Sequence, residues 1–175
     1  MNLKRNPNYV TFGAMIATSM IVMFGLMYLN SYELSHVQWS ETRFYMTFIM
    51  GAAMEVIMLT FMRGMYSNGR MNLFIYLGSL VVFVLSLFLV RSQTTVQDES
   101  YMRAMIPHHS IAILTSERAE IEDVRVRELA DEIIAAQLRE IKEMNWLLDD
   151  IRENGVATTE AEAEQRPVPA FEASP

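Results

Sequence analysis

The chain has 175 residues, of which 51% are hydrophobic, and it carries a net charge of −7, no cysteine and 15 methionines. The lack of cysteine excludes disulfides, thiolate metal sites and cysteine nucleophiles, so soft-metal chemistry would have to use methionine and histidine. Charge is unevenly divided. Residues 1–91 carry six Lys/Arg and three Asp/Glu, whereas residues 92–175 carry eight Lys/Arg and eighteen Asp/Glu. Because nucleic acids are bound by basic surfaces, the acidic second half argues against a nucleic-acid partner.

Three apolar segments in the first half predict membrane-spanning helices. Residues 10–29 and 73–90 contain no charged side chain, and residues 44–62 contain only Glu55. Each segment is close to the roughly 20 residues that a helix needs to cross a bilayer. We therefore expect an all-α protein with a three-span membrane domain over residues 1–91 and the lipid bilayer as a partner.

Basic residues near the ends of these segments predict the orientation of the chain. Lys4 and Arg5 precede the first span, and Arg63 and Arg70 lie between the second and third. The positive-inside rule then places the N-terminus in the cytoplasm and the segment after the third span in the periplasm of a bacterium. Arg91, just past the third span, is the one charge that opposes this bacterial inner-membrane orientation.

The second half contains two helical patterns that predict a hairpin over residues 92–153, followed by a disordered acidic tail over residues 154–175. A stripe at intervals of three and four marks the second helix: Ala130, Ile133, Gln137, Glu140, Met144, Leu147 and Ile151. Two helices alone bury little apolar surface, so the hairpin is expected to complete a four-helix bundle as a homo-oligomer. Packing against its own membrane domain is the monomeric alternative.

Candidate ligands gather on the first helix of the hairpin. Met102, Met105 and His109 share one stripe, and His108 belongs to the adjacent one. Pro107 would remove a helical hydrogen bond and kink or open the helix there. Adjacent helical residues point about 100° apart, so both rings would reach one metal only with help from that kink. Metal ligation and buried hydrogen-bonding histidines are both compatible with the pattern.

The donor types narrow the choice of metal. Thioether sulfur and neutral imidazole suit monovalent copper or silver, whereas a carboxylate from Glu140 would shift the preference toward divalent copper, zinc or iron. Gln137 and Glu140 would either bind the metal or orient the histidines through hydrogen bonds. Met144 would be a ligand or an ordinary core side chain.

The hairpin resembles a known bacterial family, domain-of-unknown-function family number 305. The resemblance covers roughly residues 98–150 and rests on Met-Ile-Pro-His-His at 105–109 and on the spacing of Gln137, Glu140-Ile141 and Met144. It implies a ferritin-like helical fold and copper binding in the periplasm, with the motif at Met105, His108, His109, Gln137, Glu140 and Met144. Thr115 stands where many members have a methionine, which implies a poorer thioether set. The loop from Tyr32 to His36 is similar to one in a membrane-anchored subgroup.

These observations predict a membrane-anchored envelope protein that binds a copper ion for sequestration or delivery. The expected metal residues are His108, His109, Met105, Glu140, Gln137, Met144 and Met102. A structural or accessory membrane subunit with a buried polar core is the alternative. A ferritin-like redox enzyme is less favoured, because such di-iron sites use Glu-x-x-His units, which the hairpin lacks.

Three further features have a functional and a structural interpretation. Methionines recur every four residues from Met46 to Met62 and would hand copper across a membrane or simply pack, and packing is favoured because this spacing drifts around a helix. Glu55 is a functional carboxyl or a protonated glutamate bonded to a neighbouring helix. His36 and Glu33 form an entry site or are solvated loop residues, the latter being favoured.

Overall fold

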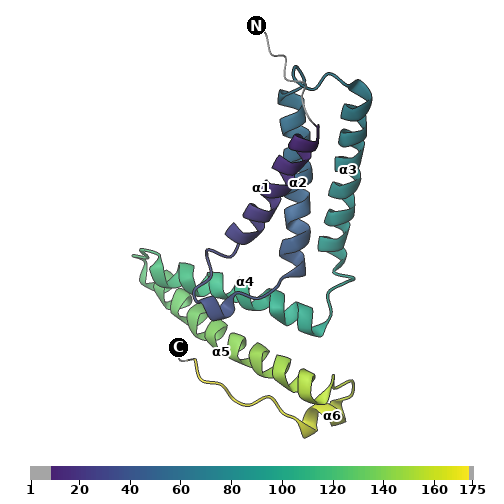
Figure 1. Ribbon diagram of the computed structural model, residues 1–175. Coiled ribbons are helices and arrows are strands. Elements are labelled where there is room, and N and C mark those ends of the chain that lie inside the picture. Colours follow the sequence, from purple (N-terminus) through teal and green to yellow (C-terminus); the bar gives the residue numbers. More distant parts are fainter. Residues whose placement is uncertain (1–8, 174–175) are drawn as a thin grey trace. The chain divides into compact units, whose positions relative to one another are not determined.

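The computed structural model describes residues 9–173 and contains only helices among them (Figure 1). Its elements are α1 (Tyr9–Leu26), the 3₁₀ turn η1 (Leu34–His36), α2 (Glu41–Phe61), α3 (Gly69–Ser92), α4 (Asp98–Arg118), α5 (Val124–Asn154) and α6 (Glu160–Gln165). The predicted all-α class is therefore confirmed. Lys4 and Arg5 lie outside the described residues.

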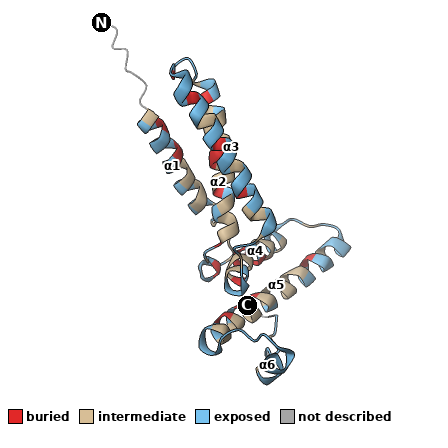
Figure 2. Cartoon of the chain, turned by 90° about the vertical axis from the view of Figure 1, so that its right-hand side faces the viewer, coloured by how far each residue is buried: buried red, intermediate tan, exposed pale blue. Residues whose placement is uncertain are grey.

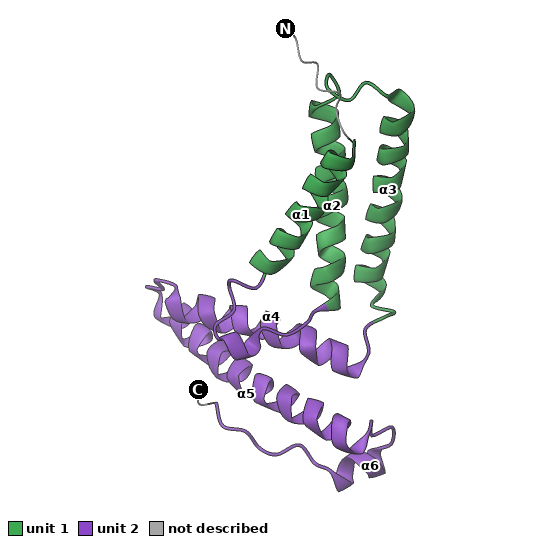
Figure 3. Cartoon of the chain, in the orientation of Figure 1, with its two compact units in different colours: residues 1–27, 41–95 green, residues 28–40, 96–175 purple. Residues whose placement is uncertain are grey.

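The chain divides into two compact units (Figure 3). Residues 1–27 and 41–95 form the three-helix unit, and residues 28–40 and 96–175 form the hairpin unit. The loop between α1 and α2, expected to be part of the membrane domain, thus groups with the hairpin.

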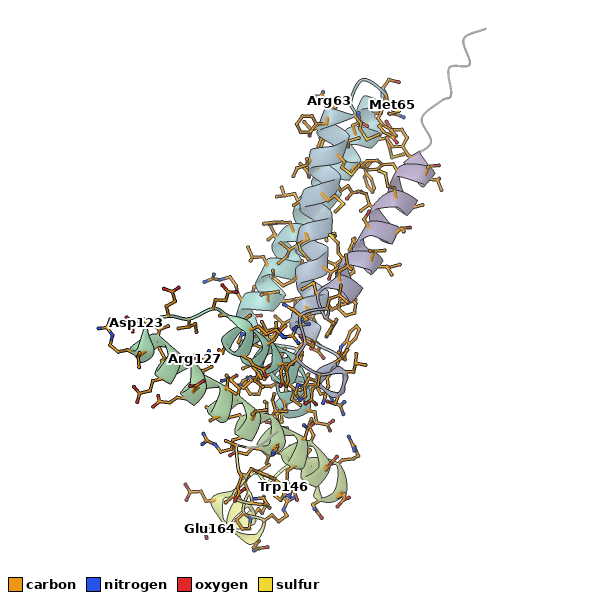
Figure 4. The ribbon with its side chains drawn as sticks, turned by 90° about the vertical axis from the view of Figure 1, so that its left-hand side faces the viewer. Arg63, Met65, Asp123, Arg127, Trp146 and Glu164 are labelled. Atoms are coloured by element: carbon orange, nitrogen blue, oxygen red, sulfur yellow. The ribbon has the colours of Figure 1, made fainter. Side chains whose placement is uncertain are left out.

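In the three-helix unit, α1, α2 and α3 are each long and apolar enough to cross a bilayer. Their bounds start a few residues before the predicted segments, because α2 and α3 also include polar first turns. The Asn68 side chain caps α3 by accepting hydrogen bonds from the N–H groups of Arg70 and Met71. At its end, Gln93 takes the left-handed conformation with φ 54°, a common way to terminate a helix. Arg63 and Met65 mark the α2–α3 loop (Figure 4).

Few side chains are buried in the three-helix unit. Its small apolar core consists of Phe12, Ile16, Leu59 and Tyr66, and Met20, Met54, Met58 and Met62 pack against it. Most of α3 is exposed (Figure 2). Much of the methionine row therefore has a packing role in this unit. At Gly51, an added Cβ would overlap the Met20 side chain, so the glycine allows α1 to approach α2 closely.

In the hairpin unit, α4 and α5 enclose a core of Met102, Ile106, Ile113, Ile141, Met144 and Leu148. Asp123 caps α5 by accepting from the N–H groups of Arg125 and Val126. Asp123 and Arg127 lie near the start of this helix, and Trp146 lies in its second half (Figure 4). α4 runs continuously through Pro107, so the proline does not open a turn there.

The buried stripe of α5 agrees with the predicted one at Ala130, Met144, Leu147 and Ile151 and differs from it between residues 133 and 141. Ala130, Ile141, Met144 and Leu148 are buried, and Ile134 and Leu138 pack against the core. Gln137 and Glu140 are only partly buried at the edge of this stripe. Intervals of three and four fit two adjacent faces of a 3.6-residue helix, and packing against α4 selects the more apolar one.

The C-terminal segment, for which composition predicts disorder, has structure up to residue 173. α6 begins with a capping box in which Thr159 and Glu162 bond each other's backbone N–H groups. Arg166 forms an ion pair with Asp150 of α5 at 2.7 Å and also donates to the Gly155 carbonyl. Specific polar contacts, which average composition does not reveal, thus tie this segment to α5.

Candidate metal site on the helical hairpin

His109 is the centre of the polar contacts between α4 and α5. Its Nε2 lies 2.7 Å from Oε2 of Glu140, and its Nδ1 lies 2.9 Å from the carbonyl oxygen of Met105, one turn earlier. The His109 side chain is 11% exposed and that of Glu140 is 40% exposed. The imidazole is therefore held from both sides within the helix pair, and the carboxylate reaches it from the edge.

These two contacts locate the protons of the pair. A carbonyl oxygen can only accept, so Nδ1 of His109 carries a proton and donates it to Met105. Nε2 and the Glu140 oxygen would both be acceptors unless one further proton lies between them. The 2.7 Å contact is a hydrogen bond when a proton lies between the two atoms, and a metal ion bound at Nε2 would occupy the position of that proton.

The structure separates the two adjacent histidines. The ring of His108 is exposed, its centroid lies 6.0 Å from that of His109, and the ring planes differ by 63°. This agrees with the 100° step between neighbouring helical residues. His109 faces the interior of the hairpin, and His108 presents its ring to the surface.

The other predicted metal residues take different positions. Met102 and Met144 are buried members of the hairpin core, with 6% and 9% exposure. Met105 is partly buried and packs against the same core. Gln137 is partly buried one turn before Ile141. The structure thus brings His109 together with Glu140 and with the backbone carbonyl of Met105. The side chains of Met102, Met105 and Met144 all lie in or against the apolar core.

Imidazole and thioether donors suit a soft metal, but the distance between His109 and Glu140 limits how both could bind one ion. A tetrahedral ion bound to both His109 and Glu140 would hold the two ligand atoms roughly 3.3 Å apart, given metal–ligand bonds of about 2.0–2.1 Å. The pair at 2.7 Å would have to open slightly. Residues 9–173 contain no group of three or more histidine, aspartate or glutamate side chains placed to hold a metal. A site in one chain would therefore need thioether sulfur.

A second polar cluster, formed by Tyr32, His36 and Ser110, fixes the α1–α2 loop to α4. Nδ1 of His36 lies 3.0 Å from the hydroxyl of Ser110, which also accepts the backbone N–H of Tyr32 at 2.7 Å. His36 is 8% exposed and Ser110 is completely buried. The expectation of solvated loop residues is thus wrong for His36.

The surroundings of His36 disfavour its charged form. Burial lowers its pKa, and the nearby carboxylate of Glu33, 3.8 Å away, acts in the opposite direction to a smaller extent. Ser110, His36 and Glu33 resemble the residue types of a hydrolase triad. Ser110 has no solvent-accessible surface and its oxygen already accepts the Tyr32 N–H, so the cluster positions the loop rather than providing a nucleophile.

Comparisons with known proteins agree with this architecture. The model of the family described as "Domain of unknown function (DUF305)" matches residues 98–172, which include α4, α5 and α6. A protein of Acanthamoeba polyphaga mimivirus, named "Uncharacterized protein L153", is 31% identical over 144 residues, covering 78% of this chain and 93% of its own length. That alignment is longer than the 78 residues from 98 to 175, so it extends into the three-helix unit.

No solved structure matches the chain. The identity with the viral relative and the match across the hairpin and its tail show that this chain belongs to the DUF305 family.

Proposed function

We propose that this protein is a membrane-anchored metal-binding protein whose hairpin holds a copper ion for sequestration or delivery. The observation that carries the proposal is the oriented imidazole of His109, with Nδ1 2.9 Å from the Met105 carbonyl and Nε2 2.7 Å from Glu140. A metal-binding imidazole is usually oriented by a carbonyl or carboxylate at its other ring nitrogen, and the Met105 carbonyl at Nδ1 has that position, which leaves Nε2 for the metal. The bound copper ion would be able to leave for another ligand, and this role requires no catalytic turnover.

The proposed ligands have distinct roles. Nε2 of His109 and the thioether of Met105 are the primary donors, since imidazole and thioether together favour monovalent copper. Glu140 orients His109 in the metal-free state and neutralises charge when the ion is bound. His108, exposed on the same helix, is placed for first capture of the ion or for a site shared with a second chain.

We further propose that the protein lies in the bacterial inner membrane with its N-terminus in the cytoplasm and its hairpin in the periplasm. The three apolar helices suit a bilayer, and the loop between α2 and α3 carries Arg63 and Arg70. A homo-oligomer is part of this proposal, because a second hairpin would supply the donors that one chain lacks. The mass of the detergent-purified protein would test this assembly.

Copper binding by the full chain in detergent tests the proposed site. Competition with a coloured copper(I) chelator would measure affinity, and elemental analysis would measure stoichiometry. We expect His109→Ala to weaken binding at least tenfold, which corresponds to about 1.4 kcal/mol, and Met105→Leu to have a similar effect. Glu140→Gln should weaken binding less than His109→Ala does, through loss of the negative charge beside Nε2. Met65→Leu is the matched control, since Met65 is 53% exposed and distant in sequence from the site.

A structural role for the same residues is the second candidate. It is favoured by the fact that both ring nitrogens of His109 have partners without any metal. In that case, His109→Ala and Glu140→Gln would lower the thermal stability of the hairpin while wild type and variants bound copper equally weakly. Equal copper affinity in wild type, His108→Ala and His109→Ala would remove the copper proposal.

A further inference from the structure

Glu55 is the one charged residue inside the apolar stretches of the three membrane-spanning helices, and the metal site does not use it. It lies on α2, seven residues before the end of the predicted second span, which corresponds to roughly 10 Å along the helix. Its Oε2 lies 2.7 Å from the hydroxyl of Ser79 on α3, and Ser79 is only 2% exposed. The carboxyl is thus partly buried at the contact between two helices.

The hydrogen bonds of Ser79 indicate which partner donates. The Ser79 oxygen also lies 2.9 Å from the carbonyl of Ile75, four residues earlier. A serine hydroxyl has a single proton, so it cannot donate to both the carbonyl and the carboxylate. Both contacts are hydrogen bonds when the Glu55 carboxyl is protonated. The carboxyl then donates to the Ser79 oxygen, and the Ser79 hydroxyl donates to the Ile75 carbonyl.

The same unit contains a matched arrangement in which the partner is a phenol. Thr60 lies 2.7 Å from the carbonyl of Val56, again four residues earlier, and 2.9 Å from the phenol oxygen of Tyr76. Because the phenol has a proton of its own, both contacts are hydrogen bonds when Tyr76 donates to Thr60 and Thr60 donates to the carbonyl. The Glu55 arrangement has the same geometry and is complete only with a protonated carboxyl in place of the phenol.

Charges on the neighbouring helices do not stabilise an ionised Glu55. α1 has no charged residue, α2 has none between Arg43 and Arg63 except Glu55, and α3 has none between Arg70 and Arg91. The phenol of Tyr9 bonds Asn72, and that of Tyr76 bonds Thr60. An unpaired charge within the hydrocarbon layer is strongly unfavourable, whereas a neutral acid with a hydrogen-bond partner is tolerated.

We infer that Glu55 is a proton-binding site within the three-helix unit, in which a neutral carboxylic acid donates to Ser79 and exchanges its proton with the aqueous phase. Ser79 is its positioning residue, and the ligand class is the proton. The oxygen donors of Glu55 and Ser79 are hard, so this site is distinct in chemistry from the thioether and imidazole groups of the hairpin.

Modification by a membrane-permeant carbodiimide tests the inference on the full chain in lipid vesicles. With N,N′-dicyclohexylcarbodiimide, the carboxyl proton moves to a carbodiimide nitrogen while the carboxylate oxygen bonds to the central carbon, giving an O-acylisourea that rearranges to a stable N-acylurea. Mass spectrometry would locate the adduct. We expect Glu55 to be modified near neutral pH and modification to fall at least about tenfold by about pH 9, as the reactive neutral acid is lost.

Two variants and a spectroscopic measurement complete the test. Infrared spectra should show the carbonyl stretch of a protonated acid, absent in Glu55→Gln and shifted to higher frequency in Ser79→Ala. Tyr76→Phe, which breaks only the matched pair, should leave modification of Glu55 unchanged. The wild-type result stands even if a variant fails to fold.

Several outcomes would overturn the inference. One is an unmodified Glu55 from about pH 5 to about pH 9, while a water-soluble carbodiimide still labels carboxyls of the hairpin. Modification that is independent of pH would show a proton that does not exchange. Protection by sodium at constant pH would show a metal cation rather than a proton as the occupant.

Discussion

Along α3 the buried positions hold Asn72, Ser79 and Ser86, whereas along α5 they hold Ala130, Ile141, Met144 and Leu148. The apolar residues of α3 lie mostly on the outside, and those of α5 mostly on the inside. These two helices therefore bury opposite kinds of side chain. Hydrophobic surface on α3 matches a lipid environment, and small polar residues allow its close approach to α2. In the hairpin unit, burial of apolar surface from water is the main stabilising term.

The polar contacts of the units differ in the same way. In the three-helix unit, the buried hydroxyls of Ser79 and Thr47 bond a carbonyl four residues earlier on their own helix. In the hairpin unit, the histidines connect separate elements, His109 to α5 and His36 to α4. The Ser79 hydroxyl combines this local contact with one to Glu55 on the neighbouring helix, whereas the two histidines reach other elements through their ring nitrogens.

Truncating the hairpin core should give the largest effect. Ile106 is completely buried, so Ile106→Ala should lower the free energy of unfolding of the hairpin by about 2–5 kcal/mol through lost burial and a residual cavity. Thermal unfolding followed by circular dichroism would measure it. Val126→Ala is the control, since Val126 is 49% exposed and should change stability by less than about 0.5 kcal/mol. Equal effects of the two substitutions would contradict the core assignment.

Removing the hydroxyl that joins the loop to α4 should have the next largest effect. Ser110→Ala leaves the Tyr32 N–H and Nδ1 of His36 without their buried partner, which should cost about 1–3 kcal/mol. Faster hydrogen exchange at the Tyr32 amide would show that the loop has separated. Ser35→Ala is a suitable control, because that hydroxyl is exposed and bonds only Glu33. An unchanged Tyr32 amide would mean that the loop is held by other contacts.

Adding a methyl group between α1 and α2 should have a smaller effect. Gly51→Ala should destabilise the three-helix unit by about 1 kcal/mol, because Met20 has to move although its side chain is flexible. Gly78→Ala on α3, where an added Cβ meets nothing within 4 Å, is the matched control. Thermal unfolding in detergent would compare them. The close α1–α2 approach would be refuted by equal stability of both variants.

The smallest expected effect is a pH dependence of the hairpin unit. Burial lowers the pKa of His36 below its ordinary value of 6.5, so the unfolded chain takes up a proton there more readily than the folded one. The stability that neutral His36 contributes is therefore complete above about pH 6.5 and declines as the pH falls below it. Thermal midpoints at pH 7.5 and about 5.5 would show the loss, and His36→Gln should remove this part of it. The three-helix unit should not share this loss, so a parallel decline in both units would contradict the assignment to His36.

The sequence alone predicted the elements whose signal is local. The three apolar helices follow from runs of residues in which Glu55 is the one charge, and the hairpin follows from the two helical patterns of the second half. The separation of His108 from His109 also follows from the fixed angle between adjacent helical residues.

What only the tertiary structure decided is how faces are paired across long separations. It selected the buried stripe of α5 that leaves Glu140 at the edge. It also brought Glu140 to His109, 31 positions away in the chain, and buried His36 against Ser110, 74 positions away. It also tied the tail to α5 through Arg166 and Asp150. The physical reason is that helical periodicity restricts an apolar stripe only to neighbouring faces of the helix, whereas the choice between them depends on the combined packing and hydrogen bonding of residues distant in the chain.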